Sequence, residues 1–302
     1  MPPSLRPGLV DDSYAVYDVF VQATADLNQR VGLPDADNHW LDPGFVASYW
    51  QRRQSLFEHL ARTADQFWVA EVDGQIVGFA RSSVRDGVRE LLEFFVRPGH
   101  QSQGIGGELL RRAFPAGDAQ RRAIIATRDV RALARYMKSG VYPRFPNYYM
   151  YRKPEPVAVA TDLEFAPASD TPETLAAIRA IDQAILGFTR DVDHQFLLQD
   201  RQAILFRRAG QVVGYGYFGK GTGPIALLNP ADFPAVLAWA ESESAARGDD
   251  EFGMQLPLIN RAAVDYLLTR GFQIEDFTVF FMSDEPFGRF ENYVITSPPF
   301  FM

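Results

Sequence analysis

The sequence contains no cysteine among its 302 residues. This absence excludes disulfide bonds, metal sites built on thiolates and a cysteine nucleophile. Histidine is also scarce. The four histidines stand far apart, with no spacing typical of metal ligands: His39, His59, His100 and His194. The sequence therefore predicts no dedicated metal centre, and any chemistry must rest on other residue types.

Long apolar runs are absent as well. No stretch approaches the ~18 uninterrupted apolar residues of a membrane span. The segment Met1–Pro7 lacks the apolar core of a secretion signal, so we expect a cytoplasmic protein without membrane partners. Hydrophobic residues still make up 47% of the chain, which is ordinary for a folded protein. At roughly 150 residues per domain, the length suggests two domains.

Positive charge is scarce in the second half of the chain. Residues 1–153 hold 20 lysines and arginines and 17 acidic residues, a net of +3, whereas residues 154–302 hold 10 and 21, a net of −11. A basic half could meet an anionic cofactor and an acidic half a cationic substrate, although acidity can also serve solubility alone. The acidic total and the lack of a basic run disfavour nucleic-acid binding.

An internal repeat spans the chain, with a polar, proline-interrupted linker in the middle. In each half, a short strand ending in proline precedes helices, which we expect at 11–30, 43–63, 172–186 and 191–200. A hairpin follows in each half, with strands at 67–72 and 75–80 and again at 203–208 and 211–216. The hairpins share Gly-Gln-Ile-Val-Gly at 74–78 and Gly-Gln-Val-Val-Gly at 210–214. This match indicates two copies of one unit.

A third similarity closes each half. One helix ends at Gly140 and another at Gly271, and a strand follows each glycine. We therefore predict an α+β, three-layer fold with two tandem domains, each a mostly antiparallel sheet flanked by helices. The predicted boundaries are 1–153 for the first domain, 154–160 for the linker and 161–302 for the second domain.

A glycine-rich turn in the first half carries the functional signal. The apolar strand Leu91–Val96 leads through Pro98 into the turn Gln101–Gly106, and an amphipathic helix follows. The first N–H groups of such a helix have no partner within it, and the helix dipole adds positive potential, so the turn is suited to a pyrophosphate. We expect Gly104 and Gly106 to be glycines because side chains there would hold phosphates away from the backbone.

The turn fits the pattern Arg/Gln-x-x-Gly-x-Gly/Ala after a strand, and a later helix fits Ala-x-x-x-Tyr-x-x-x-Gly at Ala132, Tyr136 and Gly140. In this order the two motifs resemble the GNAT superfamily of acetyl-CoA-dependent N-acetyltransferases, over the whole of residues 1–153. The resemblance implies an acyltransferase that uses acetyl-CoA as co-substrate and no metal. It also implies that the two halves are tandem GNAT-like domains.

The resemblance assigns roles to individual residues. Strand residues Phe94, Phe95 and Val96 would pair with the pantetheine arm of acetyl-CoA. The turn that would bind the pyrophosphate consists of Gln101, Ser102, Gln103, Gly104, Ile105 and Gly106. Tyr136 would protonate the departing thiolate, and a phenol with a pKa of ~10 suits that task at neutral pH. The alternative for Tyr136 is a core aromatic residue.

Direct attack by the acceptor amine in a ternary complex is the expected mechanism, because no cysteine can carry the acyl group. A carboxylate, acting directly or through water, would take the proton of the amine. The candidates are Glu93 and Glu90, which can face the same side of a strand only if a bulge intervenes. Water is the third candidate. The base of similar diamine acetyltransferases falls on Leu92 here, which leaves the base open.

The acceptor is expected to be a small primary amine, and a cationic amine is one option. Two segments are candidates for its site: the loop Gly32–Trp40, with Asp35, Asp37, His39 and Trp40, and the aromatic stretch Tyr142–Tyr151. An ordinary loop and a contact between domains are the alternatives. Competing functions are a non-catalytic acyl-CoA-binding protein and an enzyme for another acyl group. The protein could be a monomer or a homodimer.

The second half lacks the glycine turn. Asp232 stands near the start of the corresponding helix, where we expect it to cap the N-terminus and place negative charge at the phosphate position. Leu267 replaces the tyrosine. We therefore predict a degenerate copy that binds no CoA, covers the first domain and helps to form the acceptor site. The apolar tail Ser297–Met302 should be exposed unless it docks.

Overall fold

The computed structural model describes residues 3–32, 39–158, 160–299 and 301–302. The chain forms two compact units. Unit 1 comprises Met1–Tyr142 and Ser283–Glu285, and unit 2 comprises Pro143–Met282 and Pro286–Met302. The division at Tyr142 lies upstream of the predicted linker at 154–160, because the strand that follows Tyr142 pairs within unit 2. Each unit is described separately below.

Unit 1 contains a sheet with neighbours in the order β1-β2-β3-β4-β5. The strands are β1 (Ser4–Pro7), β2 (Gln66–Val72), β3 (Gln75–Arg85), β4 (Val88–Val96) and β5 (Arg121–Thr127). The helices are η1 (Val10–Asp12), α1 (Ser13–Val31), η2 (His39–Leu41), α2 (Pro43–Thr63), α3 (Ile105–Ala113) and α4 (Val130–Lys138). All neighbours are antiparallel except β4 and β5, which are parallel.

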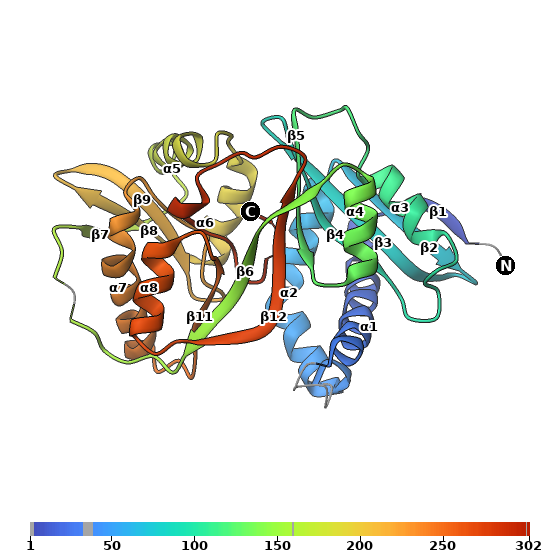
Figure 1. The fold of residues 1–302 in the computed structure, drawn as a ribbon, viewed down its shortest axis with the longest axis horizontal. Coiled ribbons are helices and arrows are strands. Elements are labelled where there is room, and N and C mark those ends of the chain that lie inside the picture. The colour runs from blue at the N-terminus through green and yellow to red at the C-terminus, as the bar shows by residue number, and fades with distance from the viewer. Residues whose placement is uncertain (1–2, 33–38, 159, 300) are drawn as a thin grey trace. The chain divides into compact units, whose positions relative to one another are not determined.

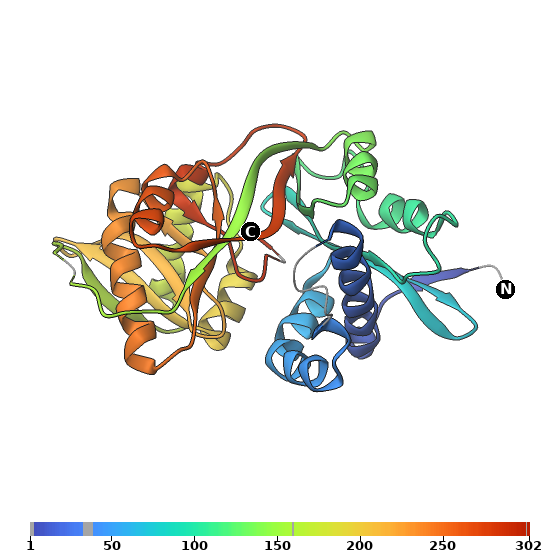
Figure 2. The same cartoon turned by 60° about the horizontal axis from the view of Figure 1, so that its bottom comes forward.

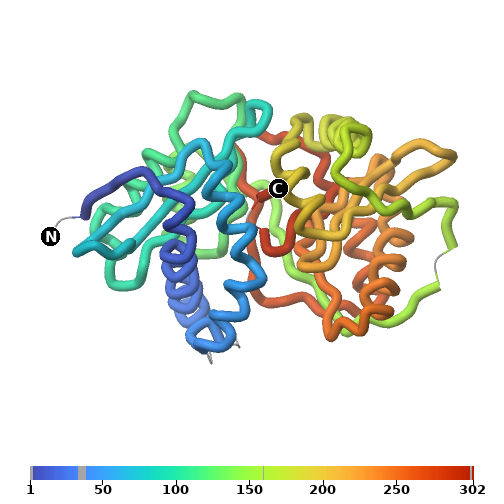
Figure 3. The backbone as a smooth tube through the Cα atoms, turned by 180° about the vertical axis from the view of Figure 1, so that it is seen from behind, coloured from blue at the N-terminus to red at the C-terminus, as the bar shows by residue number. Residues whose placement is uncertain are grey.

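Helices cover both faces of this sheet (Figures 1 and 2). On one face, Ile105, Leu109 and Ala113 of α3 pack on small and branched residues of β2 and β3, such as Ala70 and Val77. The other face is covered by α1 and α2, which lie in front of the sheet when the molecule is seen from behind (Figure 3). Alternation of side chains along β4 therefore decides which helices each residue meets.

Unit 2 repeats the order of elements. Its strands are β6 (Tyr142–Arg152), β7 (Glu164–Ala168), β8 (Gln202–Arg208), β9 (Gln211–Phe218), β10 (Ile225–Leu227), β11 (Phe252–Pro257), β12 (Gln273–Ser283) and β13 (Tyr293–Val294). Its helices are α5 (Pro172–Ile185), α6 (Asp191–Asp200), η3 (Pro230–Asp232), α7 (Phe233–Arg247), α8 (Arg261–Thr269) and η4 (Phe290–Asn292). One sheet has the order β13-β10-β9-β8-β7, and β6 pairs with both β12 and β11.

The predicted repeat is confirmed in atomic detail. Gly78 pairs with Val96 in unit 1, and Gly214 pairs with Leu227 at the matching place in unit 2. A side chain at Gly78 would come within 3.2 Å of the Phe95 carbonyl oxygen, and one at Gly214 would overlap the carbonyl oxygen of Ala226. Both glycines are therefore required by the close approach of a neighbouring strand. The predicted α+β fold is also confirmed. The four helices predicted before the hairpins are present as α1, α2, α5 and α6.

Candidate functional site

A β-bulge shapes β4. Arg81 of β3 lies opposite Glu93, but the next residue, Ser82, lies opposite Leu91, so Leu92 is an extra residue in β4. Glu90 lies opposite Ser83, which shares a sheet face with Arg81. The bulge therefore brings Glu90 and Glu93 to the same face of the sheet, the face covered by α1 and α2. The sequence predicts a shared face only if such a bulge is present.

Beyond the bulge, β4 and β5 separate. Their parallel register runs from Val88–Arg121 to Leu91–Ile124, and among the described residues it does not continue toward Val96. Arg97 N–H donates to the Val77 carbonyl oxygen, so the alternation of an antiparallel ladder directs the peptide groups of Phe95 toward β3. The peptide groups of Phe94 and Val96 then face the gap beside β4. This edge can take an extended polar ligand.

The turn after β4 is held by its own glutamines. Gln101 Nε2 donates to the Val96 carbonyl oxygen (3.0 Å), and Gln103 Nε2 donates to the Gly99 carbonyl oxygen (3.0 Å). Gly104 has a φ of +87° and open space around its missing Cβ, so its conformation requires glycine. No side chain caps the start of α3 in the described structure, and its first N–H groups remain available to an anion.

Gly106 has a role in helix packing that the sequence did not predict. A Cβ at Gly106 would lie 3.1 Å from Cζ of Phe94. Glycine at this position therefore allows α3 to pack closely on β4, and Phe94 contributes a side chain to that contact as well as peptide groups to the gap.

Arg135 is a further candidate residue for this site, and the sequence did not single it out. Its Nη1 lies 3.6 Å from the position of a Cβ on Gly107, in the first turn of α3. The guanidinium adds positive charge beside the free N–H groups, where it can meet a phosphate. The only sequence signal was its place next to Tyr136 on an amphipathic helix.

Tyr136 is buried on the α3 and α4 side of the sheet, with 6% of its surface exposed. Its ring lies edge-on to Phe94, with centroids 6.2 Å apart. Burial raises the pKa of the Tyr136 hydroxyl, Asp129 raises it further and Arg135 opposes the shift. The phenol therefore remains protonated at neutral pH and lies beside the strand that flanks the gap.

Glu93 forms a fully buried ion pair with Arg81. Arg81 Nη1 also donates to the Phe57 carbonyl oxygen (2.8 Å), and its guanidinium lies 5.1–5.5 Å from the rings of Phe57, Phe67 and Phe79. Burial raises the pKa of the Glu93 carboxyl above its ordinary value, and the charge of Arg81 offsets only part of that rise. The sequence did not foresee this pair, and the role of Glu93 as a base stays a prediction.

An aromatic cluster continues from β4 into α1, η2 and α2. Phe95 meets Phe20 edge-on at 5.2 Å, Phe20 meets Trp40 at 5.4 Å, and Trp40 meets Tyr49 at 5.2 Å. Among the residues predicted for the acceptor loop, Trp40 joins this cluster and His39 lies exposed beside it. Asp35 and Asp37 fall outside the described residues. The stretch 142–151 forms β6, which pairs with β11 in unit 2.

Unit 2 differs at each matching position. Asp232 is the N-cap residue of α7, as predicted, but its side chain makes no capping hydrogen bond, so that part of the prediction is wrong. Its carboxylate instead pairs with Arg208 at 2.9 and 3.0 Å, which offsets its negative charge. Leu267 is fully buried, and Phe272 N–H donates to its carbonyl oxygen as Val141 N–H donates to that of Tyr136. Leu267 therefore occupies the position of Tyr136.

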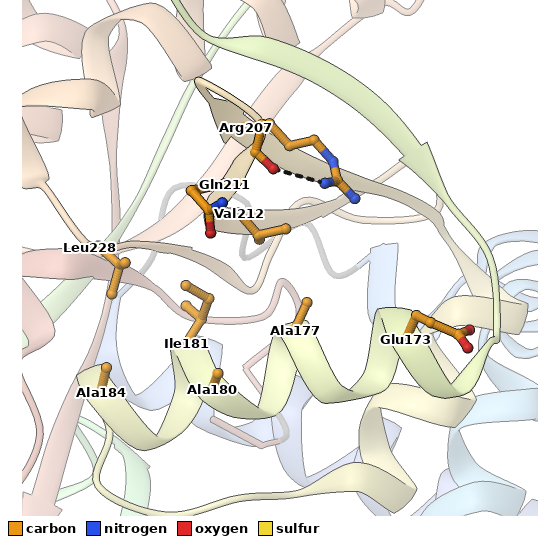
Figure 4. A pocket seen from close by; sticks show the side chains of 10 residues that line it. Glu173, Ala177, Ala180, Ile181, Ala184, Arg207, Gln211, Val212 and Leu228 are labelled. Carbon is orange, nitrogen blue, oxygen red and sulfur yellow. Dashed lines mark hydrogen bonds between the residues drawn. The ribbon is translucent and has the colours of Figure 1, made fainter.

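Each unit also has an open hollow between its first long helix and the turn of its hairpin, of about 460 Å³. In unit 2 its floor is apolar, with Ala177, Ala180 and Ile181 of α5 facing Val212, and Arg207 donates to the Gly210 carbonyl oxygen at 3.3 Å (Figure 4). The hollow in unit 1 is lined by ion-paired residues, including Arg6 and Asp12. Neither hollow includes Tyr136 or the turn before α3.

The described residues contain no group of three or more histidine, aspartate or glutamate side chains arranged to hold a metal ion. Among the same residues, no helix is long and apolar enough to cross a membrane.

Comparisons with known proteins give a family match for part of the chain and a fold for most of it. The model of the acetyltransferase (GNAT) family matches residues 33–140. No curated protein matches the chain. Among solved structures, a candidate acetyltransferase from Pyrococcus horikoshii is 16% identical, with a TM-score of 0.73 over 96% of this chain and 92% of that one.

Two further structures extend over both units. A GCN5-related N-acetyltransferase from Sphaerobacter thermophilus is 14% identical, with a TM-score of 0.59 over 95% of this chain and 97% of that one. A tandem GNAT protein from the clavulanic acid biosynthesis pathway is 15% identical, with a TM-score of 0.58 over 94% and 99%. At these identities the likeness shows the fold, which is that of tandem GNAT proteins.

Proposed function

We propose, from the premise that the chain carries a GNAT acetyltransferase domain at residues 33–140, that unit 1 transfers an acetyl group from acetyl-CoA to a small primary amine. One observation carries this proposal. The gap between β4 and β5 leads along Phe94–Val96 to the uncapped N-terminus of α3, so one continuous surface offers peptide groups and then an anion site. The matching surface of unit 2 is covered by β13.

The described residues fit acetyl-CoA in their chemistry. The peptide groups of Phe94 and Val96 would pair with the amides of the pantetheine arm. The turn Gln101–Gly106 would hold the pyrophosphate through backbone N–H groups, with Arg135 adding charge. The bound co-substrate supplies an acetyl group activated as a thioester.

The proposed reaction is a direct displacement. The neutral amine forms a bond to the acetyl carbonyl carbon, and the bond between this carbon and sulfur breaks. The thiolate takes the hydroxyl proton of Tyr136, which solvent replaces in the next cycle. The raised pKa of Tyr136 keeps that proton in place until the thiolate appears.

The proton of the attacking amine needs an acceptor. Glu93 remains the predicted base, but its carboxylate is buried in the pair with Arg81, which leaves it poorly placed for direct contact with an amine. We therefore propose water as the immediate acceptor. In this proposal, the Arg81–Glu93 pair fixes the bulged part of β4 that presents Phe94 and Phe95.

The acceptor is proposed to carry an apolar or aromatic body. The cluster of Phe20, Trp40, Tyr49 and Phe95 begins on the strand that would hold the thioester. The guanidinium groups of Arg52 and Arg53 lie 5.9 and 5.6 Å from the Tyr49 ring. Positive charge beside the cluster disfavours a polyamine, whereas aromatic faces suit a single amine on an apolar group.

A panel of amines tests this proposal. Acetyl-CoA is supplied with an arylalkylamine, an alkylamine, lysine or spermidine, and released thiol and acetylated amine are both measured. We expect equal amounts of the two products and the highest kcat/KM with the arylalkylamine. Replacing Trp40 by alanine should raise the KM for that amine by about tenfold, the cost of roughly one buried aromatic contact. Tight binding of acetyl-CoA without turnover of any amine would favour a non-catalytic binding protein.

A further inference from the structure

The last residues of the chain are buried in unit 2. Ile295, Thr296, Phe301 and Met302 each expose 3% of their surface or less. The sequence alone left this apolar tail exposed unless it docked. Strand β13, which lies just before these residues, pairs with β10.

Strand β10, with which β13 pairs, corresponds to the part of β4 that is proposed to bind the pantetheine arm. Because Gly78 pairs with Val96 and Gly214 pairs with Leu227, β10 (Ile225–Leu227) corresponds residue by residue to Phe94–Val96. In β13, Val294 pairs with Ile225 and Tyr293 pairs with Ala226. The edge that is open in unit 1 is thus occupied in unit 2 by the chain itself.

Side-chain hydrogen bonds hold β13 in place. Asn292 Nδ2 donates to the carbonyl oxygens of Leu227 (2.6 Å) and Leu228 (3.0 Å). Asn260 Nδ2 donates to the carbonyl oxygen of Tyr293 (3.1 Å), and the Tyr293 hydroxyl accepts from Arg190 at 2.6 Å. Hydrogen bonds of buried groups are costly to break, so the tail is held more firmly than by apolar contact alone.

Two glycines make room for the tail. Ser297 N–H donates to the Thr222 carbonyl oxygen at 3.0 Å, which brings the tail against the segment before β10. A Cβ at Gly221 would overlap the carbonyl oxygen of Ser297, and a Cβ at Gly223 would overlap that of Ile295. This segment is therefore fitted to an extended peptide.

We infer that residues 290–297 act as an internal ligand of unit 2, filling the slot that corresponds to the pantetheine site of unit 1. The comparison of the two slots rests on the proposed function. The inferred site takes one occupant, an extended strand of this chain's own C-terminus. It follows that the intact chain binds one acetyl-CoA, in unit 1 only.

The test displaces the tail without touching unit 1. In Gly221→Ala a single methyl group collides with the Ser297 backbone. In Asn292→Ala one buried and one partly buried hydrogen bond are lost without a collision. Gly44→Ala is the matched control, because a Cβ at Gly44 meets only the Asp42 side chain, at 3.2 Å. A carboxypeptidase then trims each intact protein, and the release of Met302 and Phe301 is timed.

We expect wild type and Gly44→Ala to release these residues slowly and at equal rates. Release should be at least about tenfold faster in Gly221→Ala, because its methyl group displaces the Ser297 backbone. It should be about fivefold faster in Asn292→Ala, which loses two hydrogen bonds but leaves the backbone unobstructed. Hydrogen exchange at residues 225–227 should rise in the same order. Equal trimming in all four proteins, or rapid trimming of wild type, would overturn the inference.

Titration with acetyl-CoA separates the inference about unit 2 from the proposed function of unit 1. One site per wild-type chain supports both, and two sites per chain would show that the slot in unit 2 is open and would overturn the inference. If no acetyl-CoA binds, the proposed function fails, while the trimming rates still decide whether the tail is docked.

Discussion

Replacing Tyr136 by phenylalanine is expected to lower kcat by about 10²–10⁴-fold, the usual contribution of a positioned general acid. The substitution removes only the hydroxyl group. The ring can keep its contact with Phe94, so the dissociation constant for acetyl-CoA should change less than twofold. Thiol release measures the first quantity, and calorimetry measures the second.

The pH profile gives this prediction a second readout. The pKa of Tyr136 is raised by burial, so its hydroxyl stays protonated well above neutral pH. The wild-type kcat/KM should therefore rise with pH as the amine loses its proton and show no alkaline decline below about pH 10. Full activity of Tyr136→Phe would mean that another group protonates the thiolate, and Tyr136 would then be a core aromatic residue.

Glu93→Gln is expected to destabilise unit 1 by about 3–5 kcal/mol, because it leaves the Arg81 guanidinium as a buried charge without a counter-ion. Arg81→Leu should cost a similar amount by leaving the Glu93 carboxylate alone. The double variant Arg81→Leu/Glu93→Leu should regain most of the lost stability, since apolar side chains often replace a buried pair at little cost. Unfolding by denaturant measures wild type and these three variants, with Glu108→Gln as the control that removes a carboxylate from ion pairs at the surface.

The stable double variant also decides the role of Glu93. If water accepts the proton of the amine, kcat/KM of the double variant should stay within about tenfold of wild type, since a positioned base contributes 10²–10⁴-fold. A larger loss in a folded double variant would identify Glu93 as the base. Additive losses of stability in the double variant would contradict the account of the buried pair.

Features set by neighbouring residues were predicted well from the sequence. Asp73-Gly74 forms the expected turn with positive φ at both residues, and Gly140 and Gly271 end their helices with φ of +85° and +77°. Gly104 likewise stands where α3 begins. In each case a glycine and its flanking pattern determine the local backbone, so no distant contact is needed to foresee it.

Features set by distant contacts were not foreseen. The partner of Asp232 is Arg208, 24 residues away, and Glu93 meets Arg81 only because β3 and β4 pair with a bulge at Leu92. The pairing of β13 with β10 joins segments far apart in the sequence, and neither strand shows a pattern that specifies the other. Long-range pairing depends on packing of the whole unit, which local propensity does not encode.

The most direct test of the central claim is a calorimetric titration of wild type and Gly104→Glu with acetyl-CoA. Gly104 has a φ of +87° at the start of α3, so glutamate would strain the turn and place negative charge at the positive end of the helix. The account predicts one site per wild-type chain and at least a 100-fold weaker affinity in Gly104→Glu, with both proteins folded. Equal affinities in the two proteins, or no binding by wild type, would contradict it.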